Sequence, residues 1–261
     1  MIYLFSAVGR AALHEFVRES TLYAFDLDGT LAPIVDDPAG ITIPAKVRHS
    51  LKQLDSLAPV AVITGRSRAD ALAHIGFTPR YLVGNHGAEG LPGQEGRDGS
   101  LHEQVAAWEE QLTELLPPET RSSILFEYKG ESLSMHYRHA ACPDDVHAAM
   151  LAAIALLVPP PRRIGGKFVE NLIPQGAPHK GDALLCIIKY AECQRAVFVG
   201  DDETDEDVFR LADNSIFGIR IGKNIESGAG SYLLSQREIL PLLDEVISVL
   251  SQSGPAPGAR P

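Results

Sequence analysis

Residues 21–30 read TLYAFDLDGT, an apolar run that ends in two carboxylates, a glycine and a threonine. Such a run is typical of a buried strand that leads into a loop. Alternate residues at the end of an extended strand project to the same side, so the carboxylates of Asp26 and Asp28 can converge. Two carboxylates held close together perturb each other's pKa, which suits the separate roles of nucleophile and acid–base group. A polar loop after a strand is the plainer interpretation of such a pair taken alone.

A second acidic stretch follows another apolar run near the C-terminus. Residues 199–207 read VGDDETDED, with six acidic residues in the seven positions from Asp201. So many like charges repel one another unless a cation lies among them, and oxygen-rich sites suit Mg²⁺. An acidic helix N-terminus would explain Glu203 or Glu206, but it explains less well the two carboxylates at the strand end. An EF-hand does not fit, because the stretch lacks its glycine and its spacing.

Two shorter segments can supply groups that hold a phosphate. Thr64 and Gly65 end an apolar run and open a helix, where a hydroxyl and a backbone N–H form a natural seat for phosphate oxygens. Lys180 opens a later helix and brings a positive charge that would offset the carboxylates. Either segment alone is usually only a helix cap.

The periodicity of apolar residues predicts alternating strands and helices in both halves of the chain. Strands are expected at 21–28, 59–63, 81–83, 196–199 and 215–219, and helices at 45–57, 68–75, 181–190 and 205–211. This alternation predicts a Rossmann-like α/β fold with a doubly wound parallel sheet. Sites in such sheets are built at the carboxyl ends of the strands, where the acidic stretches fall.

Between the two halves the pattern changes to that of an α+β module. Helices are expected at 101–116 and 143–158, and hairpins pair 123–128 with 133–138 and 162–164 with 167–172. We therefore expect a core in two parts, an inserted module between them and a disordered tail. The expected ranges are 1–90 and 174–252 for the core, 91–173 for the insert and 253–261 for the tail.

The composition excludes several classes of protein. The 261 residues carry 34 acidic and 23 basic side chains, a net charge of −11, and 45% apolar residues, enough for a real core. The acidic balance argues against a nucleic-acid partner. No apolar run approaches the ~20 residues of a membrane span. Three cysteines without a CxxC pair argue against a disulfide framework or a zinc cluster and favour a cytoplasmic location.

Four segments in this order resemble the motifs of the haloacid dehalogenase superfamily of phosphatases. They are FDLDGTL (25–31), VITGRS (62–67), HKGDAL (179–184) and VGDDETDEDVF (199–209). The insert lies between the second and third of them, as the cap domain does in sugar phosphatases of that superfamily. A finer resemblance is to the trehalose-6-phosphate phosphatases, carried by FDLDGTLAPI, ITGRS, GNHGAE (84–89), EYKGESLSMHYR (127–138) and KFVE (167–170).

The resemblance implies a Mg²⁺-dependent phosphatase that hydrolyses trehalose 6-phosphate to trehalose and phosphate. Asp26 would be the nucleophile that forms an aspartyl-phosphate, and Asp28 would be the acid–base group. Asp26, the backbone carbonyl of Asp28, and Asp201 would hold Mg²⁺, with Asp202 and Asp205 in support. The phosphoryl oxygens would be held by Thr64, Gly65 and Lys180.

The same resemblance places the sugar site in and around the insert. Its residues would be Arg66, Asn85, His86, Glu127, Lys129, His136, Arg138 and Glu170. In the plainer interpretation several of these are exposed hairpin charges, or His136 and Arg138 brace the insert. The chain departs from the family pattern after Glu170, where an apolar residue replaces a basic one and the segment before Lys180 is longer. Asn85 stands where many relatives carry an aliphatic residue.

Three other functions stay open at this point. One is the same chemistry on another phosphosugar, such as a glycosyl-phosphoglycerate or sucrose phosphate, because fold does not decide substrate. A second is a non-catalytic sugar-phosphate sensor, against which the intact Asp26, Asp28, Lys180 and Asp201 count. A third, a phosphotransferase, needs a second acceptor that the sequence does not indicate. The expected partners are a small phosphosugar and a trehalose-phosphate synthase of the same pathway.

Overall fold

The structure is a computed structural model that describes residues 1–35, 40–94 and 100–252. The chain forms two compact units: residues 1–93 with those from 178 onward, and residues 94–177. We call the first unit the core and the second unit the cap. Each boundary lies a few residues further along the chain than the expected insert of 91–173, and the expected tail at 253–261 lies outside the described residues.

The core is built on a seven-stranded sheet in the order β1-β11-β10-β9-β2-β3-β4. Every neighbouring pair in it is parallel. The strands are β1 (Ile2–Tyr3), β2 (Thr21–Phe25), β3 (Val60–Ile63), β4 (Tyr81–Val83), β9 (Arg195–Gly200), β10 (Ile216–Ile221) and β11 (Ser231–Leu233). The predicted parallel α/β sheet is confirmed.

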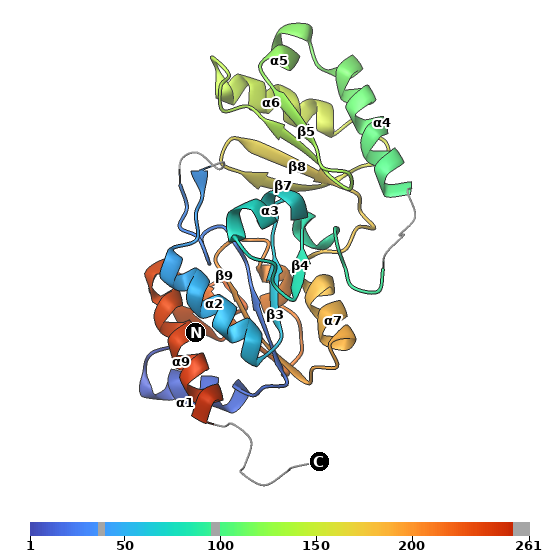
Figure 1. Cartoon of the computed structure of the whole chain (residues 1–261). Helices are drawn as coiled ribbons and strands as arrows, with labels where there is room; N and C mark the ends of the chain where they lie inside the picture. The colour runs from blue at the N-terminus through green and yellow to red at the C-terminus, as the bar shows by residue number, and fades with distance from the viewer. Residues whose placement is uncertain (36–39, 95–99, 253–261) are drawn as a thin grey trace. The chain divides into compact units, whose positions relative to one another are not determined.

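Helices cover both faces of this sheet, as the alternating side chains of its strands require. Tyr23 and Phe25 of β2 pack with α1 (Ala7–Phe16), α2 (Ala45–Leu57), α3 (Arg68–Ile75) and α9 (Ile239–Gln252). Leu22 and Ala24 point the other way, toward α7 (Lys180–Tyr190) and α8 (Glu206–Phe209). Figure 1 shows α2 and α9 on one side of the strands and α7 on the other. The sheet is therefore doubly wound.

Some elements near the ends of the core were not predicted from the sequence. Strands β1 and β11 and helices α1 and α9 were not predicted, and 215–219 was expected to be the last strand. The two strands have only two and three residues, too few for a period-two pattern to be visible. Helix α8 ends at Phe209, short of the expected 211. The chain then turns back into β10, and the carboxylate of Asp213 accepts hydrogen bonds from the N–H and hydroxyl of Ser215 in that turn.

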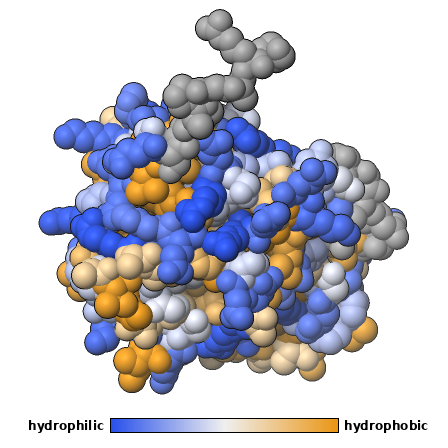
Figure 2. Space-filling view, turned by 90° about the horizontal axis from the view of Figure 1, so that it is seen from below, coloured by the Kyte–Doolittle hydropathy of each residue, from blue (hydrophilic) through white to orange (hydrophobic). Residues whose placement is uncertain are grey.

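The face of the molecule seen in Figure 2 is mainly polar. Hydrophilic residues dominate that view, and apolar residues form small separate patches. Among the described residues, no helix is long and apolar enough to cross a membrane.

The cap has a four-stranded antiparallel sheet in the order β5-β6-β8-β7. Its strands are β5 (Leu125–Tyr128), β6 (Leu133–His136), β7 (Arg162–Gly166) and β8 (Val169–Ile173), and its helices are α4 (Ser100–Leu115), α5 (Pro118–Ser122) and α6 (Pro143–Ile154). Helices α4 and α6 supply the apolar residues that cover one face of the sheet, with Trp108 and Met150 fully buried. The expected α+β insert with two hairpins is confirmed.

Helix α6 ends four residues before the predicted end at 158. Pro159 disfavours helical backbone at Val158, the residue before it, so the helix cannot continue to 158. Val158 and Pro159 instead contact helix α4. The side chain of Gln111 bonds both the N–H and the carbonyl of Val158, and the Trp108 indole N–H donates to the Pro159 carbonyl at 2.7 Å.

This contact predicts the effect of Trp108→Phe on the stability of the cap. The substitution leaves the Pro159 carbonyl without its donor and removes part of a fully buried ring. We expect a loss of about 1–3 kcal/mol in the free energy of unfolding, measured by circular dichroism in urea. Leu115→Ala, at a partly exposed position of the same helix, is the control and should change it much less. An equal loss for both variants would contradict the packing described here.

Candidate active site

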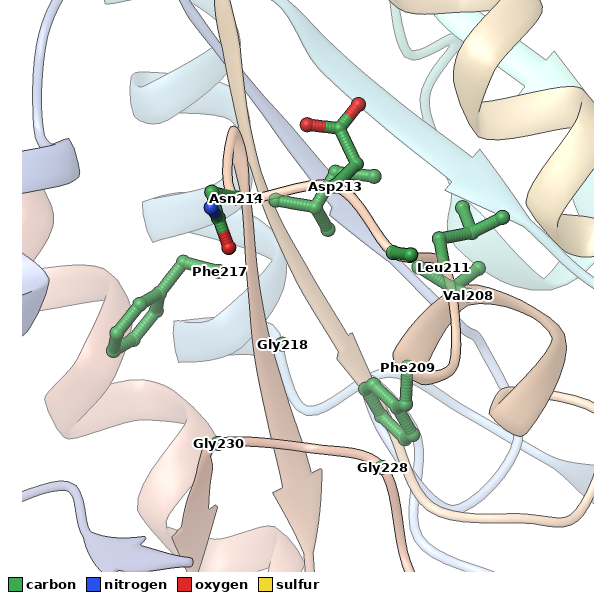
Figure 3. A pocket seen from close by; sticks show the side chains of 11 residues that line it. Val208, Phe209, Leu211, Asp213, Asn214, Phe217, Gly218, Gly228 and Gly230 are labelled. Carbon is green, nitrogen blue, oxygen red and sulfur yellow. The ribbon is translucent and has the colours of Figure 1, made fainter.

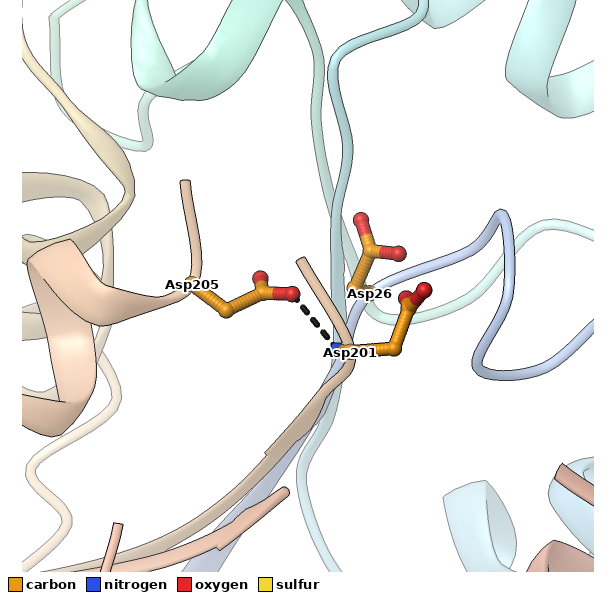
Figure 4. Close-up of side chains that lie close together, drawn as sticks. All are labelled: Asp26, Asp201 and Asp205. Carbon is orange, nitrogen blue, oxygen red and sulfur yellow. Dashed lines mark hydrogen bonds between the residues drawn. The ribbon is translucent and has the colours of Figure 1, made fainter. Parts of the chain in front are cut away.

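Two aspartates lie at the same edge of the core sheet because their strands are neighbours. Asp26 follows β2 and Asp201 follows β9, and the Asp26 N–H donates to the Val199 carbonyl at 2.9 Å. One carboxylate oxygen from each of Asp26, Asp201 and Asp205 lies within 4.8 Å of the others. Figure 4 shows the three side chains gathered at this point. The two acidic stretches of the sequence thus meet in space.

Lys180 lies fully buried within this acidic cluster. Its Nζ donates to Asp26 Oδ1 and to Asp205 Oδ1, both at 2.8 Å, and its side chain is 1% exposed. The lysine opens helix α7, which is held by a reciprocal cap between His179 and Asp182. The end of α7 therefore delivers one positive charge to the edge where β2 and β9 end.

Asp205 and Asp202 shape the loop that carries Asp201. Asp205 Oδ2 accepts hydrogen bonds from the backbone N–H groups of Asp201 at 2.8 Å and Asp202 at 3.0 Å, and the first is the dashed line in Figure 4. Asp202 Oδ1 accepts from the N–H and hydroxyl of Thr204 and from the N–H of Asp205. These two carboxylates hold the loop in place.

Asp28 lies beside the cluster, on a more exposed position, and Arg66 holds it. Arg66 donates from Nε and Nη2 to the two carboxylate oxygens of Asp28, each at 2.7 Å, and from Nη1 to Asp70. The Asp28 side chain is 40% exposed, against 6% for Asp26. Arg66 was expected among the sugar-binding residues, and the structure places it on the carboxylate expected to act as acid and base.

Gly29 and Thr30 of the first motif lie against the side chain of Asp201. A Cβ on Gly29 would lie 2.1 Å from Asp201 Oδ2, and the backbone there has a φ of +83°, which favours glycine. The Thr30 hydroxyl donates to Asp201 Oδ1 at 3.1 Å. The Asp-Gly-Thr sequence indicated a functional loop. That Gly29 and Thr30 contact Asp201 could be seen only in the tertiary structure.

The crowded carboxylates perturb one another's protonation. Burial raises the pKa of Asp201 to about 7, and the charges of Asp205 and Asp202 act in the same direction. Burial also raises the pKa of Asp26 well above its usual range, against the opposing effect of Lys180. Burial acts to raise the pKa of Asp202 too, but Lys180 and the Thr204 hydrogen bond prevail and lower it to about 2. The ionised forms of Asp26 and Asp201 are thus disfavoured in the cluster, in spite of the charge of Lys180.

The residues around Asp201 fit a hard divalent cation. Its candidate ligands, Asp26 and Asp201, offer carboxylate oxygens, the donors that Mg²⁺ prefers. The carboxylate of Asp205 is already bonded to Lys180 and to two backbone N–H groups. The raised pKa values of Asp26 and Asp201 are the effect that a bound cation would reverse.

The predicted phosphate residues lie at the end of β3. Thr64 and Gly65 follow Ile63, and the Thr64 hydroxyl accepts a hydrogen bond from the Arg66 N–H. The His86 ring lies against Gly65, where a Cβ would be 2.4 Å from it. Asn85 is fully buried and donates to Glu89 at 3.2 Å. Asn85 and His86 both have positive φ, in a loop that packs against the start of α7.

Four of the predicted cap residues lie on the hairpin β5–β6 or just beyond it. Glu127 Oε2 lies 2.9 Å from His136 Nε2 and 3.2 Å from Lys129 Nζ. The His136 hydrogen bond and the Lys129 charge lower the pKa of Glu127 to about 2. The Arg138 guanidinium lies 5.8 Å from the Phe168 ring centroid. Glu170, on β8, is bonded elsewhere, to His147 and Arg163.

A separate hollow of about 280 Å³ lies at the start of β10 (Figure 3). Phe209, Phe217 and Gly218 are among its lining residues. Since β9 and β10 are parallel, this hollow is near the amino end of the sheet, whereas the acidic cluster is at the carboxyl end. It is not part of the candidate active site.

The doubly wound core and the inserted cap have the fold of solved haloacid dehalogenase-like hydrolases. A haloacid dehalogenase-like hydrolase from Bacteroides thetaiotaomicron matches with a TM-score of 0.61 over 89% of this chain and 99% of that chain. The trehalose-6-phosphate phosphatase C-terminal domain of C. albicans matches with a TM-score of 0.69, over 92% of this chain and 96% of that chain. The identities are 14% and 22%, so these two likenesses concern the fold alone.

The chain belongs to the trehalose-phosphatase family, whose model matches residues 24–232. A trehalose-phosphate phosphatase of Mycobacterium marinum is 34% identical over 197 residues, which are 71% of this chain. The match covers 50% of that protein and 50% of a trehalose-phosphate phosphatase of Mycobacterium ulcerans, so the chain spans about half the length of these two relatives. The expected family is thereby confirmed.

Lys180→Met tests the charge balance of the acidic cluster. The substitution leaves the carboxylates of Asp26 and Asp205 buried without their counter-charge. Loss of one partner of a buried pair costs about 3–5 kcal/mol, and we expect a loss of that size in urea unfolding at neutral pH. Lys189→Met, on the exposed side of the same helix, is the matched control and should be nearly neutral. A loss below about 1 kcal/mol for Lys180→Met would show that the cluster does not depend on this charge.

Proposed function

We propose that this protein is a Mg²⁺-dependent phosphatase that hydrolyses trehalose 6-phosphate to trehalose and phosphate. The family match over residues 24–232 supports the class of reaction. The observation that carries the proposal is the group of Asp26, Asp201 and Lys180 at the carboxyl edge of the sheet, in which Asp26 and Lys180 are buried. A phosphate monoester is an anion, and a carboxylate can attack it only where positive charge offsets the repulsion between them.

Asp26 is the proposed nucleophile. Its carboxylate attacks phosphorus, the bond to the sugar oxygen breaks, and an aspartyl-phosphate forms. Lys180 holds one oxygen of Asp26 at 2.8 Å, which fixes the direction of the carboxylate and places an ammonium beside the phosphoryl group. Thr64, Gly65 and Lys180 are the proposed donors to the phosphoryl oxygens, from a hydroxyl, a backbone N–H and an ammonium group.

Asp28 is the proposed acid and base. It gives a proton to the departing sugar oxygen and then takes one from the water that hydrolyses the aspartyl-phosphate. Arg66 contacts both oxygens of its carboxylate, so we assign Arg66 the role of orienting Asp28. The two carboxylates of the first motif would thus work in different surroundings, one buried and one partly exposed.

Asp26, Asp201 and the backbone carbonyl of Asp28 are the proposed Mg²⁺ ligands. When bound there, Mg²⁺ would supply positive charge that offsets the repulsion between the carboxylate nucleophile and the phosphate. Asp202 and Asp205 support the site by holding the loop that carries Asp201.

The sugar is proposed to be bound with help from the cap. Glu127, Lys129 and His136 form one connected polar group, and charged groups of this kind bind hydroxyls well. Arg138, Asn85 and His86 stay predictions for the sugar site, whereas the carboxylate of Glu170 is bonded to His147 and Arg163. We further propose a cytoplasmic location and a trehalose-phosphate synthase as the enzyme that supplies the substrate. The rival substrates are other phosphosugars, and a panel of them assayed for phosphate release decides among them.

Asp26→Asn should abolish turnover and leave the fold intact. The amide keeps the shape of the side chain but removes the nucleophilic charge, and Lys180 retains Asp205 as its partner. We expect a fall in kcat of at least ~10³-fold on trehalose 6-phosphate, with an unchanged circular dichroism spectrum. Retention of more than a few per cent of the activity would exclude Asp26 as the nucleophile.

Removal of Mg²⁺ with a chelator should stop catalysis, and Asp201→Asn should do the same. Because an ion that binds only the folded state stabilises it, Mg²⁺ should also raise the melting temperature of the wild type by several degrees. That shift should vanish in Asp201→Asn and persist in Glu203→Gln, an exposed carboxylate of the same acidic stretch outside the cluster. Full activity in chelator would overturn the metal assignment.

A further inference from the structure

The register of the cap sheet decides which residues share a face. Paired residues of an antiparallel sheet project to the same side. Phe126, Met135 and Glu170 are paired across β5, β6 and β8. Met135 is fully buried in the apolar core that includes residues of α4 and α6. Glu170 therefore lies on the face that the cap helices cover.

Both carboxylate oxygens of Glu170 have partners on the covered face. The residue is 3% exposed. Its Oε1 lies 2.8 Å from Nε2 of His147, which belongs to α6, and its Oε2 lies 3.2 Å from Nη2 of Arg163. The His147 ring is stacked on Tyr137 at 4.9 Å between centroids. These contacts tie the sheet to α6, which is a structural role.

The opposite face, which we call the outer face, carries a different row of residues. Glu127, Ser134, Asn171 and Ile164 are paired in that order across β5, β6, β8 and β7. Strands are about 4.8 Å apart, so the backbones of Glu127 and Asn171 are about 10 Å apart on either side of Ser134. Glu127 and Glu170 are the two carboxylates of the four strands, and only Glu127 is on the outer face.

Asn171 has the chemistry to bind a sugar hydroxyl. Its Oδ1 accepts a hydrogen bond from the Ser134 hydroxyl at 2.6 Å, and its Nδ2 donates to the Ile164 carbonyl at 3.1 Å. An amide has two N–H groups and two lone pairs on its oxygen, so a second donor and a second acceptor position remain beside these bonds. The two bonds also fix the rotamer, which prepares the amide for a ligand.

We propose that Asn171, and not Glu170, is the residue through which β8 contacts the sugar and sets the selectivity for it. The proposal rests on the proposed function and refines its substrate class. One carboxylate at Glu127 and one neutral amide at Asn171 suit a neutral sugar that presents hydroxyls, because the amide can donate to one oxygen and accept from another.

The test compares two adjacent residues that lie on opposite faces. The activities kcat/KM of Asn171→Ala and Glu170→Gln are measured on trehalose 6-phosphate and on p-nitrophenyl phosphate, which has no sugar. For Asn171→Ala we expect a 3- to 10-fold loss on trehalose 6-phosphate, the usual effect of one neutral hydrogen bond, and less than a 2-fold change on the aryl phosphate. For Glu170→Gln we expect an unchanged ratio of the two activities and a lower melting temperature.

Ser134→Ala and Asn171→Ser guard against a purely structural effect. Ser134→Ala removes the hydrogen bond to the amide but keeps the amide, so the activity ratio should change less than in Asn171→Ala. Asn171→Ser keeps a small polar group if the alanine variant does not fold, and its activity ratio should also fall. A fall of the ratio in Glu170→Gln with none in the Asn171 variants would overturn the proposal. If the wild type prefers another phosphosugar, the proposed substrate fails, and the same comparison on the preferred sugar still decides the role of Asn171.

Discussion

A buried ammonium group between two buried carboxylates is the constraint on which the core depends. Lys180 lies 2.8 Å from both Asp26 and Asp205 with almost no exposure, and none of the three charges would be stable there alone. The start of α7 must therefore lie against the ends of β2 and β9. Through its second oxygen, Asp205 also holds the backbone of the loop that presents Asp201. The sheet order and the charge balance are thus satisfied by one arrangement.

The acidic cluster crowds Asp26 and Asp201 so closely that their ionised forms are disfavoured. Burial and like charges raise the pKa of Asp26 and Asp201, which is unfavourable for a fold but suitable for a site that receives a cation and a phosphate. The surroundings of Asp28 differ, because its side chain is partly exposed and is bonded to Arg66. The proposed division between a buried nucleophile and a more exposed acid–base group follows from this difference in surroundings.

The cap repeats this separation of roles on the two faces of one sheet. Glu170 joins His147 and Arg163 on the face that α4 and α6 cover, and there it strengthens the packing. Glu127, with His136 and Lys129, lies on the outer face together with Asn171. Two adjacent residues of β8 therefore belong to different networks, one structural and one proposed to meet the sugar.

The sequence alone determined the parallel core, the α+β insert and the acidic stretches that meet in the site, because apolar periodicity and the carboxylates after each buried run are local signals. It could not show the short strands β1 and β11, which exist only by pairing with the rest of the sheet. Nor could it show that Arg66 holds Asp28, or that Glu170 faces the cap helices while Asn171 does not. Those facts were decided by the tertiary structure, since side-chain partners and strand register depend on residues far apart in the chain.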